Sequence, residues 1–449
     1  MARTLPQAQA FCVIFGVWKR FETAAGLPIS GWPVVGLGKV KGDRCRQKAR
    51  NFLSIVSEGP FAMYRWMHWI IPIYRWIRWI IGVTFCLVSF PGSAEELRVV
   101  YFGNSFLENS VPWFHPILAK GAGKELKVQA FLGPGWQIWM HVDAMRRHPD
   151  GPPRKTLTSG EWNAVLIQHF GSHPGIKNNV RKSVFLNQEF DEPRDVSDLA
   201  AASEIIDLLL GSAKAPEQIR VFIYNSWPAM PGVAELEKRI REETERFLLE
   251  VGRSRQEILQ ALQERKPTPE ELDPLVRKFN YAEHWLAPYE WNPQVPWESK
   301  NAHSRDYITR LMEELRAKYP ALARTGRLRL IPNGEVFFAL DQKARAGQLP
   351  GIDNIGRFYT DGGHVRCGLP RFTLAATCYA VMFGEHPGRL DYTIYNDKEN
   401  YRNDKLPQPG YVHWPDIGEL IPITPERAKV VTDTVWQVVC ENPYTSVHP

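Results

Sequence analysis

The sequence predicts an α/β protein in which a mostly parallel, five-stranded sheet has helices on both faces. Three observations lead to this fold class. Five short runs are apolar or β-branched, which is typical of buried strands. Helical stretches such as Val196–Gly211 separate most of the runs, and alternating strands and helices favour a parallel sheet. Several runs end in Gly, Asn or Pro, as strands commonly do. The runs are Leu97–Gly103, Lys127–Gly133, Ala164–Phe170, Ile219–Trp227 and Leu328–Pro332.

The composition is that of an ordinary globular protein, with 449 residues, 44% of them hydrophobic and 23% charged. The formal net charge of +6 is unevenly spread along the chain. Residues 1–92 hold 12 Lys or Arg and 3 Asp or Glu, a net +9, so the remainder carries a net −3. A nucleic-acid-binding body would need a clustered basic face, so this charge distribution argues against that class.

The number and spacing of the cysteines argue against two classes of protein. The chain has six cysteines and no CxxC pair, which argues against a zinc ribbon or a redox motif. Six cysteines in a chain of this length also exclude a disulfide-dense scaffold, although they leave room for one disulfide bridge. The six are Cys12, Cys45, Cys86, Cys367, Cys378 and Cys440.

The first part of the chain divides into two segments. Residues 1–62 mix short apolar runs with a basic cluster, and we interpret them as a disordered basic extension or as a start upstream of the natural one. Residues 63–94 have a basic start, an apolar core from Trp79 to Phe90, and small residues at the end, which predicts a signal peptide and export. The alternative is an interfacial helix or uncleaved anchor, which would attach the protein to a membrane through residues 63–90.

The body at 95–449 contains a helical and aromatic insertion at about 232–320, between the fourth and fifth strands. Ala234–Gln263 and Pro269–Phe279 have charged helical patterns, and helix resumes at Ala302–Lys318. Between them lies a loop rich in Trp, Tyr and Pro. Its Trp291 and Trp297 are candidates for stacking on sugar rings at a site entrance, although aromatic residues that simply pack the insertion would give the same pattern.

The C-terminal part also reads as helical. After a Gly- and Pro-marked linker at Ala346–Ile355, Leu374–Phe383 has a helical pattern. A last helix is expected at Thr424–Cys440, where Thr424 is a good N-cap and Pro425 suits the first helical position.

The turn Gly103-Asn104-Ser105 follows the first strand directly and precedes a helical pattern at Val111–Lys120. In an open parallel sheet, ligands bind at the carboxyl ends of the strands. Ser105 is therefore well placed to be a nucleophile. The alternative is that Asn104 and Ser105 only shape the turn or cap a helix, as such residues often do.

A serine nucleophile needs a base, and His364 is the histidine with an Asp three residues before it. Asp361 and His364 lie in a Gly-rich loop shortly before a helix, and such a loop can fold over the carboxyl edge of the sheet. His364 would then accept the Ser105 proton while Asp361 orients the imidazole. The alternatives are that Asp361 caps a turn and that His364 is a surface histidine.

An oxyanion needs preorganised hydrogen-bond donors. The backbone N–H of Ser105 is one candidate. Gly135 supplies a second candidate, because no Cβ hinders the approach of its N–H to a substrate. A side-chain amide is expected as the third donor. Gln168 and Asn225 lie near the ends of the third and fourth strands, and either is equally readable as a structural amide.

These features together resemble the SGNH (GDSL-like) hydrolase superfamily. Gly103-Asn104-Ser105 resembles its first block, and Asp361-Gly362-Gly363-His364 resembles its last. The resemblance implies a flavodoxin-like three-layer α/β/α sandwich and hydrolysis of esters, often acetyl esters on carbohydrates. It implies neither a metal nor an organic cofactor.

The sequence departs from that family at the end of the third strand, where the family has Gly-x-Asn-Asp. Here the chain reads Ile167-Gln168-His169-Phe170-Gly171, so either Gln168 or Asn225 substitutes for the missing Asn, or the oxyanion hole is incomplete. Gln168 is preferred, because some exported bacterial branches of the superfamily look similar on this strand.

The function expected from the sequence is that of an exported or membrane-attached serine esterase acting on an O-acylated carbohydrate. Two alternatives remain open. One is a non-catalytic carbohydrate-binding protein on the same scaffold, and the other is a membrane-bound acyl transferase that uses the same nucleophile.

Overall fold

The computed structural model describes residues 96–170, 197–258, 267–292, 300–401 and 418–448, together with the backbone of 179–183 and 188–195. The extension predicted at 1–62 and the signal or anchor segment predicted at 63–94 lie outside these residues. Within the described ranges, no helix is both long and apolar enough to cross a lipid bilayer.

The core of the molecule is a five-stranded parallel sheet with the strand order β2-β1-β3-β6-β7. Numbered within this sheet alone, that order is 2-1-3-4-5, the flavodoxin-like arrangement of doubly wound α/β proteins. The central strands are almost entirely buried, as expected where helices cover both faces. The strands are β1 (Leu97–Gly103), β2 (Leu126–Leu132), β3 (Ala164–Gln168), β6 (Arg220–Tyr224) and β7 (Leu328–Ile331).

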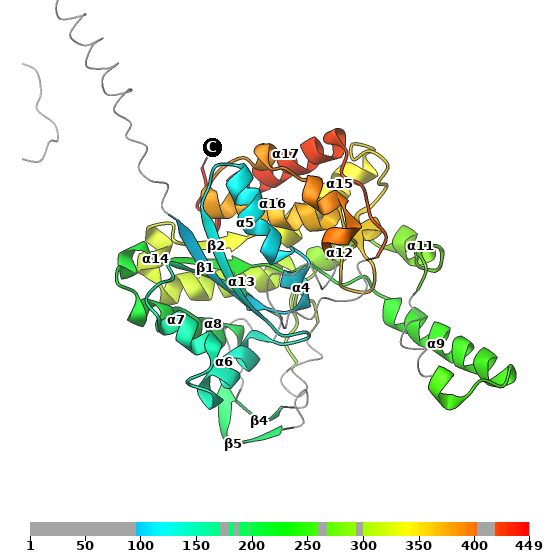
Figure 1. Ribbon diagram of the computed structural model, residues 1–449, viewed down its shortest axis with the longest axis horizontal. Coiled ribbons are helices and arrows are strands. Elements are labelled where there is room, and N and C mark those ends of the chain that lie inside the picture. The colour runs from blue at the N-terminus through cyan, green and yellow to red at the C-terminus, as the bar shows by residue number, and fades with distance from the viewer. Residues whose placement is uncertain are drawn as a thin grey trace, which may run out of the picture. The chain divides into compact units, whose positions relative to one another are not determined.

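Helices pack in a layer on each face of the sheet and so complete an α/β/α sandwich (Figure 1). One layer contains α5 (His115–Gly121), α15 (Asn333–Arg345), α16 (Leu369–Phe383) and α17 (Pro425–Glu441). The other layer contains α6 (Ile138–Arg147), α7 (Pro152–Thr158), α8 (Asp198–Ser212) and α13 (Arg305–Lys318). The residues of α16 from Leu369 to Met382 are all buried, because this helix packs between the sheet and α17.

The insertion between β6 and β7 is helical, as predicted, but the helix expected over Ala234–Gln263 is interrupted at residues 251–254 and resumes at 255–258, and residues 259–263 lie outside the described ranges. At the interruption the chain turns at Gly252, whose φ of +72° lies in the left-handed region that favours glycine. Thr268 begins α11 with a reciprocal capping box to Glu271. The insertion contains α9 (Val233–Glu250), α11 (Pro269–Lys278), α12 (Tyr281–Trp285), α13 and α14 (Pro320–Arg324).

Two further elements differ from the sequence prediction. The helix expected at Val111–Lys120 is split into a short 3-10 helix at Pro112–Phe114 and α5. Val111 precedes both with a φ of +55°, and Pro112 and Pro116 lie in their first turns. An antiparallel hairpin, β4 (Asn179–Ser183) and β5 (Gln188–Asp195), was not expected, since its polar sequence lacks a strand pattern. The remaining short helices are α4 (Ser105–Glu108), η2 (Pro112–Phe114), η3 (Pro216–Gln218), η5 (Ile355–Phe358), η6 (Pro387–Arg389), η7 (Thr393–Asn396) and η8 (Lys398–Tyr401).

The cysteines that the structure describes do not form a bridge. Cys367, Cys378 and Cys440 are free thiols, and the first two are buried. The other three lie outside the described residues.

Candidate active site

The turn after β1 presents Ser105 at the first position of α4. Asn104 caps this short helix: its Oδ1 accepts the N–H of Phe106 at 2.9 Å, and its Nδ2 donates to the Trp136 carbonyl at 2.8 Å. Asn104 thus performs the capping role that the sequence left open, and it also ties the turn to the loop after β2. The Ser105 side chain sits at the carboxyl end of β1 and is 8% exposed.

Gln168 braces this turn from the neighbouring strand β3. Its Oε1 accepts the backbone N–H groups of Asn104 at 2.8 Å and Leu107 at 3.2 Å. Two backbone donors fix this oxygen, so the amide nitrogen points the other way, toward the His169 carbonyl at 3.2 Å and Ser226 Oγ at 3.4 Å. Gln168 was predicted as an oxyanion donor, but the structure gives its amide hydrogens to these groups instead.

We expect Gln168→Leu to lower the free energy of unfolding by about 2–4 kcal/mol, because it leaves two buried N–H groups without an acceptor. Urea denaturation measures this difference. Gln437→Leu on the exposed face of α17 is the matched control and should change stability by less than about 0.5 kcal/mol. Equal stability of the two variants would show that Gln168 is not a brace.

The structure brings Ser105, His364 and Asp361 together. His364 Nε2 lies 2.8 Å from Ser105 Oγ, and His364 Nδ1 lies 2.7 Å from Asp361 Oδ2. The second carboxylate oxygen, Oδ1, accepts the backbone N–H groups of Gly363 and His364, both at 2.7 Å. Asp361 therefore shapes the loop with one oxygen and holds the imidazole with the other.

The environment keeps Asp361 ionised. Burial alone would raise its pKa, but the hydrogen bond with the His364 ring and those from the two backbone N–H groups outweigh it and lower the pKa to about 2. Because Oδ2 belongs to a carboxylate and can only accept a hydrogen bond, a neutral His364 must carry its proton on Nδ1. Nε2 is then the acceptor, oriented to take the Ser105 hydroxyl proton.

Neighbouring elements fix the loop that carries Asp361 and His364. Asn109, at the end of α4, accepts the N–H of Val365 at 2.8 Å and donates to the Ser105 carbonyl. Trp227 donates its indole N–H to the Gly363 carbonyl at 2.9 Å. A Cβ at Gly363 would lie 2.9 Å from the Phe106 ring, so glycine allows the loop to approach the nucleophile turn this closely. Asn109 was not predicted from the sequence.

Backbone donors near Ser105 are available for an oxyanion. Gly135 adopts a φ of +70° in the loop whose Trp136 carbonyl binds Asn104. Within the described part of the chain, no group accepts from the N–H of Gly135 or from that of Ser105.

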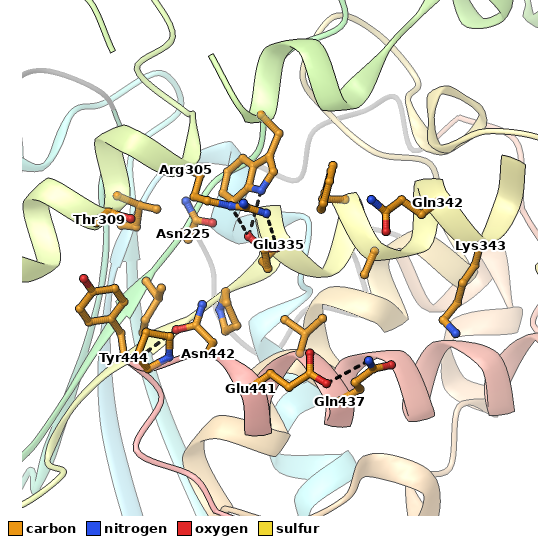
Figure 2. Close-up of a pocket in the computed structure, with 18 of the residues that line it drawn as sticks. Asn225, Arg305, Thr309, Glu335, Gln342, Lys343, Gln437, Glu441, Asn442 and Tyr444 are labelled. Carbon is orange, nitrogen blue, oxygen red and sulfur yellow. Dashed lines mark hydrogen bonds and ion pairs between the residues drawn. The ribbon is translucent and has the colours of Figure 1, made fainter. Parts of the chain in front are cut away.

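Asn225 belongs to a different part of the sheet edge. Its Oδ1 accepts the N–H of Gly334 at 3.0 Å, and its Nδ2 lies 3.3 Å from Nε2 of His169. It lines a cavity of about 760 Å³ next to β7. Figure 2 shows it beside Arg305 and Glu335, with Gln437 and Glu441 of α17 on another wall. The structure therefore does not bring Asn225 to Ser105.

Of the two tryptophans predicted to bind substrate, the structure describes Trp291, and its role in binding stays a prediction. Trp291 is half-buried and packs against the hydrophobic core. Trp297 lies outside the described residues.

Phe106 links the triad to the insertion through aromatic contacts. Its ring centroid lies 5.8 Å from that of His364 and 5.6 Å from that of His303, which stacks on it at an interplanar angle of 18°. Phe170 and Trp227 complete its surroundings at 5.5 and 5.0 Å. His303 was not singled out in the sequence, because no local pattern distinguishes it from His284, the other histidine of the insertion.

Among the residues that the structure describes, no cluster of three or more His, Cys, Asp or Glu side chains could hold a metal ion.

No protein-family model matches the chain, and no curated protein matches it either. Among solved structures, it is similar to a DUF4886 family protein from Bacteroides uniformis ATCC 8492, at 11% sequence identity and a TM-score of 0.39. The similarity covers 77% of this chain and 96% of that one. At this level of similarity, the other protein says nothing about the chemistry of this chain.

Proposed function

We propose that the protein is a serine esterase that hydrolyses O-acyl esters, with acetyl esters of carbohydrates as the expected substrates. The observation that carries this proposal is the unbroken chain of hydrogen bonds from Ser105 Oγ through His364 to Asp361 at the carboxyl end of β1. Side chains from two distant parts of the sequence, Ser105 on one side and Asp361 and His364 on the other, meet in the geometry that nucleophilic catalysis requires. This intact geometry favours hydrolysis over the binding-only alternative.

In the proposed mechanism, His364 Nε2 takes the proton of the Ser105 hydroxyl as Oγ attacks the ester carbonyl. The N–H groups of Ser105 and Gly135 stabilise the oxyanion. His364 then returns the proton to the leaving alcohol, which gives an acyl-enzyme. Water attacks this intermediate with His364 again as the base, and the acid and free Ser105 are released. Asp361 stabilises the imidazolium in both steps.

The carbohydrate half of the proposal comes from the resemblance to SGNH hydrolases. Export and membrane attachment depend on residues 63–94 and stay predictions.

Covalent labelling tests the proposed nucleophile directly. The full-length protein should hydrolyse p-nitrophenyl acetate, and phenylmethylsulfonyl fluoride should modify Ser105, as peptide mass spectrometry can show. His364→Ala should abolish labelling, because the hydroxyl then lacks its base. Ser110→Ala is the matched control, since Ser110 is buried and donates to the Leu107 carbonyl. Absence of both hydrolysis and labelling would contradict the proposal.

A further inference from the structure

Two histidines beside the proposed active site have enclosed ring nitrogens without a hydrogen-bond partner. They are His169, directly after Gln168 at the end of β3, and His303, directly before the N-cap of α13. In each ring, the enclosed, unpaired atom is Nδ1. An unpaired buried polar group is destabilising, so it calls for a functional explanation.

The contacts of Asn225 assign the tautomer of His169. The backbone N–H of Gly334 must donate to Asn225 Oδ1, so the amide nitrogen is the group that faces His169 Nε2. That ring nitrogen is then an acceptor. Burial lowers the pKa of His169 well below its usual value, so the ring is neutral at pH 7. Its single proton is therefore on the enclosed Nδ1.

His303 lies next to this enclosed donor. The two ring centroids are 6.1 Å apart, and His303 also contacts Phe170 at 5.4 Å. Burial lowers the pKa of His303 to about 4, so it too is neutral at pH 7. Its Nδ1 is enclosed and its Nε2 is not among the enclosed atoms, so Nε2 is the ring nitrogen that can reach a bound molecule.

We propose that His303 is a substrate-binding residue whose Nε2 forms a hydrogen bond with a hydroxyl group in the alcohol half of a carbohydrate ester. The neighbouring His169 ring, which Asn225 contacts, helps to position the ring of His303. This inference rests on the proposed esterase function. It brings the insertion between β6 and β7 into the active site.

Two features indicate that the group bound by His303 belongs to the alcohol half of the ester and is uncharged. The described contacts connect His303 to the nucleophile turn through the ring of Phe106, so a two-carbon acyl group on Ser105 is too short to need this hydrogen bond. A neutral imidazole among Phe106 and Phe170 offers a hydrogen bond without a countercharge, which suits a hydroxyl group better than a carboxylate.

His303→Phe tests the proposal, because it keeps an aromatic ring on Phe106 and removes both nitrogens. For the full-length protein, we expect kcat/KM on 6-O-acetylglucose to fall roughly tenfold, mainly through KM, since one neutral hydrogen bond is lost. Hydrolysis of p-nitrophenyl acetate, which has no hydroxyl group, should stay within twofold. His303→Gln retains an N–H donor and should recover part of the loss.

His284→Phe is the matched control, because His284 stacks on Phe279 in the same insertion at 5.7 Å and 20°. It should change neither activity. Thermal unfolding separates binding from packing: His303→Phe should be at least as stable as the parent, since it removes an unpaired buried nitrogen. An equal loss on both esters, no loss on either, or a marked loss of stability would each overturn the proposal.

A binding measurement keeps this test independent of catalysis. Calorimetry of 6-O-acetylglucose with Ser105→Ala and with Ser105→Ala/His303→Phe should show weaker binding to the double variant. Equal affinities would overturn the role of His303. If the parent protein hydrolyses no ester while the two affinities differ as expected, the esterase proposal fails and the binding role of His303 stands.

Discussion

We expect Ser105→Ala to lower kcat on p-nitrophenyl acetate by at least ~10³-fold, because it removes the hydroxyl that forms the acyl-enzyme in the proposed mechanism. Asp361→Asn should lower it by about 10³- to 10⁴-fold, since an amide at Oδ2 no longer holds the His364 proton on Nδ1. The two effects should not add. Once the nucleophile is gone, orienting its base has little left to contribute, so the double variant should match Ser105→Ala.

Steady-state kinetics of the purified variants measure these losses, and Ser110→Ala provides the background for nonspecific hydrolysis of this reactive ester. Near-normal activity in Ser105→Ala would assign the hydrolysis to another residue. Additive losses in the double variant would show that Asp361 acts outside the triad.

Acidification from pH 7 to pH 5 should lower the free energy of unfolding, and His115 and His141 should together account for about 4 kcal/mol of this loss. Burial lowers the pKa of His115 and of His141 to about 4, from about 6.5 in an unfolded chain. Below pH 6.5 the unfolded chain therefore binds protons that the folded protein does not bind. Each histidine stabilises the fold fully above pH 6.5, loses this contribution as the pH falls toward 4, and accounts for about 2 kcal/mol at pH 5.

The structure explains why these rings stay neutral. His115 uses both nitrogens, one at 2.9 Å from the Ser110 carbonyl and the other at 3.0 Å from the Tyr101 hydroxyl, so the neutral ring is fully hydrogen-bonded within the buried core. Nε2 of His141 lies 2.9 Å from the carbonyl of Gly103, at the end of β1.

Urea denaturation at several pH values measures this dependence. His141→Gln keeps an amide donor for Gly103 and removes one titrating ring, so it should lose about 2 kcal/mol less between pH 7 and pH 5 than the parent. A stability that is flat over this range would contradict the prediction. Asp361 contributes in a separate window: its lowered pKa stabilises the fold above pH 4, and this contribution disappears as the pH falls toward 2.

The sequence predicts the sheet well because its strands are buried on both faces. Leu97–Gly103 was placed at its observed bounds, and the other four strands lie within a few residues of theirs. Such runs are continuous apolar segments, and local composition suffices to recognise them. The hairpin β4–β5 was missed for the same reason, since it has no apolar run to recognise.

The residues of the triad were also accessible to sequence reasoning, because each lies in a Gly-marked loop next to a strand or helix. The direction in which a side chain points could not be predicted from the sequence. Gln168 is on the expected strand end, but only its two backbone donors reveal that its oxygen, rather than its nitrogen, faces the Ser105 turn. His303 joins the site through contacts with Phe106 and Phe170, which are more than 130 positions away and leave no trace in its local sequence.

The order of the chain has a consequence for when the protein becomes active. Ser105 and His364 are separated by 259 positions, and the last strand of the sheet ends before Asp361. A ribosome that has completed all five strands has therefore made the nucleophile but not the base. A growing chain in this condition carries an ordinary, unreactive serine. Under the proposed esterase function, hydrolysis becomes possible only after Asp361 and His364 have been synthesised and have docked against Ser105, so an unfinished chain that lacks them would leave esters intact.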